Sequence, residues 1–208
     1  MFKLPSLTKK YPLLLVIAVV VVYYFLIYLG SGTFHIGNAY NVPKTIVDEL
    51  IQFTPWTVWI YIISYVYLFA PFVVTKDKEE IDKFLYSFIS LSTVSCLIFF
   101  FFPTTVPRHE FVVAPDTFFL TKMSLEILRK LDVPFNCLPS LHVSTATLCY
   151  LFVARVKRQW HWGFLIMSVA ISVSTMSTKQ HHFYDCIAGF VLGVIFFRMF
   201  FNKSRATK

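Results

Sequence analysis

Residues 11–29 read YPLLLVIAVVVVYYFLIYL, a run of apolar and aromatic side chains that contains no charged residue. In water, its valines and isoleucines would favour a β-strand. In a lipid bilayer every backbone N–H and C=O group must find a partner within the segment, so a run of this length forms a helix. The run is longer than the apolar core of a signal peptide, about 7–15 residues, and no A-x-A cleavage site follows it. It therefore predicts a retained transmembrane helix.

Five further apolar runs follow the first. They cover residues 56–74, 84–102, 141–156, 160–178 and 183–201. The composition agrees with a bilayer environment, because 57% of the 208 residues are hydrophobic and only 14% are charged, against about 25% charged in soluble domains. We therefore expect an all-α, polytopic membrane protein with six transmembrane helices, forming a single domain over residues 1–208.

The lysine and arginine residues are unevenly distributed between the two sides that six spans define. Thirteen of the 19 lie on the side of the N-terminus. Cytoplasmic loops carry the excess of basic residues in membrane proteins, so we expect both termini in the cytoplasm. This topology also explains the net charge of +8, and no nucleic-acid partner is expected.

The longest loop on the opposite side runs from residue 103 to residue 140. Within it, residues 121–131 mix apolar and charged side chains at the spacing of an amphipathic helix. Such a helix can lie on the membrane surface or pack against the protein. The glycines at 189 and 193 likewise fit close helix packing within the chain or between copies, so the oligomeric state stays open.

Three polar clusters fall on this same side of the membrane, around residues 102–108, 139–142 and 174–185. Ionisable side chains at membrane depth are costly and are candidates for function. The four cysteines show no C-x-x-C spacing and are interpreted as packing residues, so they predict no metal site.

His181 and Asp185 are four residues apart, which places them on one face of a helix. A carboxylate there can fix one imidazole nitrogen and leave the other free as a nucleophile or base, although a purely structural pair is the alternative. His182 is the rival of His181, but it points about 100° away on a helix.

Ser140 is placed to cap a helix that begins near Leu141, and free N–H groups at a helix start bind anions. His142 lies in the first turn of that helix, where it could protonate a leaving oxygen. Arg108 could bind a phosphate with two parallel hydrogen bonds, or simply extend its side chain toward the membrane interface.

Together these motifs resemble the type-2 phosphatidic acid phosphatase superfamily. The second signature of that family, P-S-x-H, is intact at residues 139–142. Its third signature places a histidine seven residues after a serine and an aspartate four residues further on, as Ser174, His181 and Asp185 do. Residues 178–189 are similar to the branch that includes inositol phosphorylceramide synthases.

The resemblance implies a role for each residue. His181 would attack the phosphorus and form a phosphohistidine, and Asp185 would orient it. His142 would protonate the leaving alcohol and then activate the water or acceptor. The phosphate would be neutralised by Arg108, Ser140 and Lys179. The family requires no metal and no cofactor.

The chain departs from the family at two expected cations. Phe101 stands at the lysine position of the first signature, His109 replaces the proline after Arg108, and Thr175 stands at the arginine position of the third signature. These losses put the details of phosphate binding in doubt and leave the His–Asp–His core untouched.

The expected function is therefore that of an integral membrane lipid phosphatase, with a lipid phosphate as substrate and its site on the periplasmic, extracellular or luminal face. The alternative is a lipid phosphotransferase. A non-enzymatic transporter or assembly factor is the competing class, and its support in the sequence is the pair of missing cations.

Overall fold

The computed structural model describes residues 5–132 and 134–201. Lys3, Lys203, Arg205 and Lys208, which enter the orientation argument above, lie outside these ranges. The structure contains 73% helix and 3% strand, which confirms a helical fold.

The elements are, in chain order, α1 (Leu7–Lys10), α2 (Leu13–Thr33), β1 (Tyr40–Asn41), α3 (Ile46–Leu50), η1 (Pro55–Thr57), α4 (Val58–Tyr67), α5 (Ala70–Val74), α6 (Lys78–Phe101), β2 (Thr104–Thr105), η2 (Arg108–Glu110), α7 (Phe119–Leu131), α8 (Leu141–Val156), η3 (Arg158–Trp160), α9 (His161–Ser177) and α10 (Phe183–Phe201).

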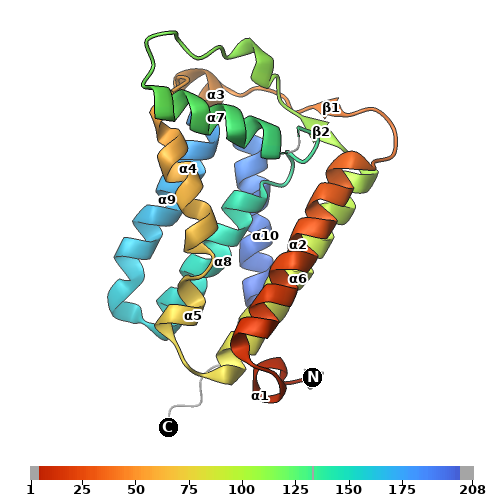
Figure 1. The fold of residues 1–208 in the computed structure, drawn as a ribbon, viewed down its shortest axis with the longest axis vertical. Coiled ribbons are helices and arrows are strands. Elements are labelled where there is room, and N and C mark those ends of the chain that lie inside the picture. The colour runs from red at the N-terminus through yellow and green to blue at the C-terminus, as the bar shows by residue number, and fades with distance from the viewer. Residues whose placement is uncertain (1–4, 133, 202–208) are drawn as a thin grey trace.

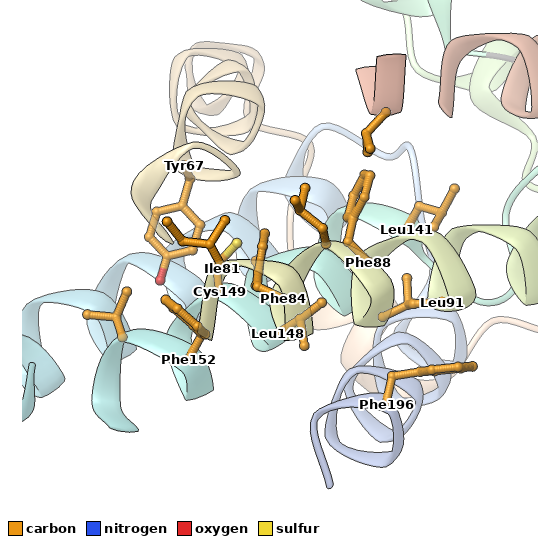
Figure 2. Packing of buried hydrophobic residues seen from close by; sticks show 14 of the residues in the cluster. Tyr67, Ile81, Phe84, Phe88, Leu91, Leu141, Leu148, Cys149, Phe152 and Phe196 are labelled. Carbon is orange, nitrogen blue, oxygen red and sulfur yellow. The ribbon is translucent and has the colours of Figure 1, made fainter. Parts of the chain in front are cut away.

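The long helices run side by side as a bundle, as Figure 1 shows. The short helices α3 and α7 and the two-stranded parallel ladder of β1 and β2 gather at one end, which we call the loop end. Helix α1 lies at the opposite end. The core between the helices is apolar and aromatic, and Phe84, Leu148 and Phe152 lie close together in it (Figure 2).

Within the described residues, three helices are long and apolar enough to cross a membrane, namely α2, α6 and α10. Helix α8 is apolar but shorter. Large apolar side chains stay exposed on the outer faces of the bundle, among them Leu14, Leu26 and Phe190. Such a surface is disfavoured in water and suits the hydrocarbon of a bilayer.

Two of the expected spans differ most from the sequence prediction. Residues 56–74 do not form one helix, because α4 ends at Tyr67 and α5 starts at Ala70. Pro71 has no N–H group with which to continue the helix, which accounts for the break. Helix α6 begins at Lys78 and not at residue 84, because the Asp77 carboxylate accepts hydrogen bonds from the N–H groups of Glu79 and Glu80 and caps an earlier start.

The amphipathic helix expected in the loop between residues 103 and 140 is present as α7. Its residues Leu125 and Leu128 are buried against Val58 and Tyr61 of α4. Other apolar side chains, such as Ile127, remain exposed. One face of α7 therefore packs on the protein, and this packing covers the loop end of the bundle.

Helices α8 and α10 approach each other closely at the two glycines, Gly189 and Gly193. A Cβ atom on Gly189 would lie 2.5 Å from the Ser140 carbonyl oxygen, and one on Gly193 would lie 2.6 Å from that of Ser144. The glycines therefore serve packing within the chain, and only residues without a side chain allow this contact.

Candidate active site

His181 and Asp185 lie together where the chain turns from α9 into α10. His181 Nδ1 is 3.4 Å from Asp185 Oδ2, and both side chains are buried. His181 precedes the first turn of α10, so a shared helical face does not explain the contact as the sequence argument supposed. Instead, Asp185 Oδ2 accepts the His182 N–H at 2.8 Å, as the third residue of a helix does in a capping box.

The turn before α10 is held by backbone hydrogen bonds. The Thr175 carbonyl accepts the N–H groups of both Gln180 and His181, at 3.0 and 3.1 Å. Thr175 thus lacks the positive charge of the family signature but still fixes the loop that carries His181. Phe101, at the other lost cation position, has half of its surface exposed at the end of α6.

His142 lies in the first turn of α8, facing His181 across the packed α8–α10 pair. Ser140 caps the helix as predicted, because its hydroxyl accepts the Val143 N–H at 3.4 Å. The Ser140 N–H donates to the Asp185 carbonyl at 3.0 Å, which ties the two helix starts together. As a result the His142 and His181 ring centroids are 6.1 Å apart.

His182 has a different environment from its neighbour. Its Nδ1 is 2.9 Å from the Val42 carbonyl oxygen, so the ring is engaged by the segment after β1. This contact favours His181 over His182 as the histidine that works with His142.

An unexpected carboxylate, Asp132, lies beside His142. It follows the end of α7 and is buried, with Oδ1 3.8 Å from His142 Nε2. Its oxygens also accept hydrogen bonds from the hydroxyl groups of Tyr28 and Tyr61, the latter at 2.6 Å. Sequence reasoning missed Asp132, because nothing in its neighbourhood along the chain marks it. The tyrosines that bind it, Tyr28 and Tyr61, are two of the seven in the apolar runs 11–29 and 56–74 and do not stand out among them.

The charge of Asp132 is supported from several sides. Burial alone would raise the pKa of Asp132, but the contact with His142 and the positive charge of Arg108 outweigh it and hold this pKa well below its usual range. Asp132 is therefore an anion, and it cannot serve as a proton donor near neutral pH.

Arg108 is buried between the two loops that carry Asp132 and His181. Its guanidinium donates to the Asp132 carbonyl at 2.8 Å and to the Gln180 carbonyl at 3.4 Å. Its Nε–H has no hydrogen-bond partner among the described residues. Burial acts to lower the pKa of Arg108, but the negative charge of Asp132 more than compensates and raises it, so the cation is retained in the site.

Lys179 is held away from solvent by the end of α3. Its ammonium donates to the carbonyls of Asp48, at 2.8 Å, and Ile51. Two of its three donors are thus engaged there, and burial lowers the pKa of Lys179. Its backbone adopts the left-handed region, with φ of 56°, which is uncommon for a residue other than glycine.

The side chains of Asp132, His142 and His181 each bring one possible ligand atom within 4.8 Å of the others. A second such group consists of Cys137, His181 and Asp185. The Asp132 oxygens are already occupied by tyrosine hydroxyls, and burial raises the pKa of Cys137 to about 12, which keeps it a thiol. Metal ligands must be deprotonated and available, so neither group is assigned as a metal site.

The comparison with known families gives one match. A family model described as PAP2 superfamily matches residues 40–199, which include every residue of the site described above except Tyr28. No curated protein and no solved structure matches the chain significantly.

Proposed function

The chain belongs to the PAP2 superfamily, and on this basis we propose that it is an integral membrane enzyme that dephosphorylates a lipid phosphate through a phosphohistidine intermediate. The observation that carries the proposal is the pair of buried histidines, His142 and His181, whose rings are 6.1 Å apart and which each contact a carboxylate. Membership in the family fits both a phosphatase and a phosphotransferase.

In the first step, His181 is the nucleophile. Asp185 Oδ2 lies 3.4 Å from Nδ1, and a proton held on Nδ1 by this carboxylate leaves the lone pair on Nε2. A bond forms between Nε2 and phosphorus while the bond between phosphorus and the lipid oxygen breaks. His142 gives its proton to that oxygen, and the lipid alcohol leaves.

In the second step, His142 acts as the base. It takes a proton from a water molecule, whose oxygen attacks the phosphorus as the bond to His181 breaks. Inorganic phosphate leaves, and His142 has recovered the proton that it gave in the first step. No metal and no cofactor are needed for this cycle.

The phosphate is bound by positive charge and by backbone donors. Arg108 supplies a buried guanidinium with an uncommitted Nε–H. Ser140 caps α8, and the N–H groups of the first turn of this helix offer an anion site. Lys179 is the third proposed contributor, and binding a phosphate directly would require its ammonium to leave the carbonyls at the end of α3. Phosphoryl transfer depends chiefly on such positioning and charge neutralisation.

For the membrane arrangement we propose six crossings, made by α2, by α4 together with α5, and by α6, α8, α9 and α10. Both termini are then cytoplasmic, and the loop end with the site faces the periplasm, the cell exterior or a lumen. The support is the distribution of lysine and arginine residues along the chain.

A lipid phosphotransferase is the second candidate. In this reaction an alcohol replaces water in the second step. The similarity of residues 178–189 to inositol phosphorylceramide synthases favours it. So does burial, because His142 and His181 expose only 7% and 2% of their surface, and a closed site disfavours attack by water.

The test is the release of phosphate by the detergent-purified protein in the presence of EDTA. The substrates are phosphatidic acid, phosphatidylglycerophosphate and a polyprenyl diphosphate. Wild type is compared with His181→Ala and with His161→Ala, a control at the start of α9, which lies at the end of the bundle opposite the loop end (Figure 1). We expect release that His181→Ala abolishes and His161→Ala retains.

Other outcomes change the proposal in defined ways. Transfer of phosphate to a second lipid without any release would replace the phosphatase with the phosphotransferase. Activity that survives both His142→Ala and His181→Ala would reject an enzyme of this kind.

A further inference from the structure

Asp132 has no part in the reaction cycle above, although it is buried at the centre of the site. Its Oδ1 is 3.8 Å from His142 Nε2, and a carboxylate oxygen lies within 4.8 Å of a nitrogen of His181. An isolated anion in such a place would be costly, so its retention requires compensation.

The compensation comes from hydroxyl groups on two separate helices. Tyr28 of α2 donates to Oδ1 and Tyr61 of α4 donates to Oδ2, at 2.6 Å for Tyr61. The backbone carbonyl of Asp132 is fixed as well, by the guanidinium of Arg108. The carboxylate is thus held in one orientation, and a substrate phosphate cannot simply displace it.

The ring of His142 lies beside this carboxylate. At 3.8 Å, Nε2 and Oδ1 are too far apart for a good hydrogen bond, and they form an ion pair only while His142 is protonated. In that state the Nε2 proton is available to a leaving oxygen, and the carboxylate faces the positive charge of the ring. On the other side of the ring, Nδ1 is 3.2 Å from the Ser64 hydroxyl, which sets the ring plane.

We propose that Asp132 is the positioning residue of the general acid, a fixed carboxylate that holds the His142 ring in place for proton transfer to the leaving lipid oxygen. The inference rests on the proposed function. The site then has two histidine–carboxylate pairs. Asp185 orients the nucleophile His181, and Asp132 orients the acid His142. The other charged or titratable groups that face His142 are Tyr61, Tyr65 and His181, with Arg108 behind Asp132.

The test is a cycle of four proteins, namely wild type, Asp132→Asn, His142→Ala and the double variant. We expect Asp132→Asn to lower kcat about 100-fold and to change KM less than about 3-fold, because a general acid contributes about 10²–10⁴-fold. In the His142→Ala background the same change should cost less than about 3-fold, since Asp132 acts only through His142. Glu126→Gln removes an exposed carboxylate of α7 as the control and should leave kcat unchanged.

A purely structural role gives a different pattern, because the loss from Asp132→Asn would then be equal in both backgrounds and would overturn the inference. A lower KM with an undiminished kcat would also overturn it, since Asp132 would then merely occupy the phosphate position. If Asp132→Asn does not fold, Tyr61→Phe replaces it in the same four-protein comparison. We then expect kcat to fall about 3–10-fold in the wild-type background and not in the His142→Ala background.

The two proposals can fail separately. Wild-type turnover that Asp132→Asn leaves intact would reject the role of Asp132 and keep the phosphatase. The absence of wild-type turnover on every lipid would reject both.

Discussion

The two histidines of the site are built in opposite ways. The carboxylate beside His181 belongs to Asp185, which lies four residues further along the chain at the start of α10. The partners of His142 lie on other elements, namely Ser64 on α4 and Asp132 in the loop after α7. The first pair is a local motif, whereas the second exists only once three segments have packed. Local motifs are visible in a sequence, and assembled ones are not.

Variants of the two histidine–carboxylate pairs should block different steps of the reaction. Asp185→Asn should lower kcat about 10³-fold and should form no phosphoenzyme, because the proposed nucleophile, His181, loses its orientation. With an aryl phosphate, whose leaving group needs no proton, His142→Ala should form the phosphohistidine and hydrolyse it slowly. The measurement is acid-labile ³²P label retained on the protein after a rapid quench.

Label on Asp185→Asn at the wild-type rate would show that the local pair is structural. An unlabelled His142→Ala protein that is folded would assign His142 to the first step alone.

Arg108 connects the two pairs, because it donates to the carbonyls of Asp132 and Gln180. Arg108→Gln should lower kcat/KM about 100-fold by removing the buried cation of the proposed phosphate site. Arg108→Lys should recover part of the loss through its charge. Lys179→Gln should have a smaller effect, mainly on the melting temperature, since its ammonium is engaged at the end of α3. The check is a kcat and KM series on one lipid phosphate.

The close contact of α8 and α10 sets the distance between the two histidines. Gly189→Ala would place a methyl group 2.5 Å from the Ser140 carbonyl and force the helices apart. We expect destabilisation of about 1–3 kcal/mol and a loss of activity of about 10-fold. Gly163→Ala, where a Cβ meets nothing within 4 Å, is the matched control. Unfolding in denaturant and turnover are measured together, and equal behaviour of the two variants would contradict the packing argument.

A smaller change is expected in the melting temperature, through the charge of Asp132. Because the pKa of Asp132 is held well below its usual range, its charge stabilises the fold fully above the unfolded value of about 3.9. This contribution declines as the pH falls below that value. The difference in melting temperature between wild type and Asp132→Asn, about 3 °C at pH 7, should therefore narrow at pH 3. A difference that widens there would contradict the assignment of Asp132 as an anion.

Much of the fold could be predicted from the sequence because long apolar runs must become helices in lipid. The runs at 141–156 and 183–201 coincide with α8 and α10. The predicted helix bounds were wrong at two places. Pro71 lacks an N–H group and divides α4 from α5, and Asp77 caps α6 and starts it early. Capping of α8 by Ser140 was predicted correctly because a cap depends only on neighbouring residues.

The family, the helical class and the local motifs at 139–142 and 181–185 follow from the amino-acid sequence alone, since each depends on residue type and short spacing. Packing in three dimensions was needed to establish which histidine faces His142, where the ammonium of Lys179 goes, and that Asp132 lies beside the site. A buried carboxylate is tolerated only where remote hydroxyl groups and cations converge on it, and that convergence is a property of packing.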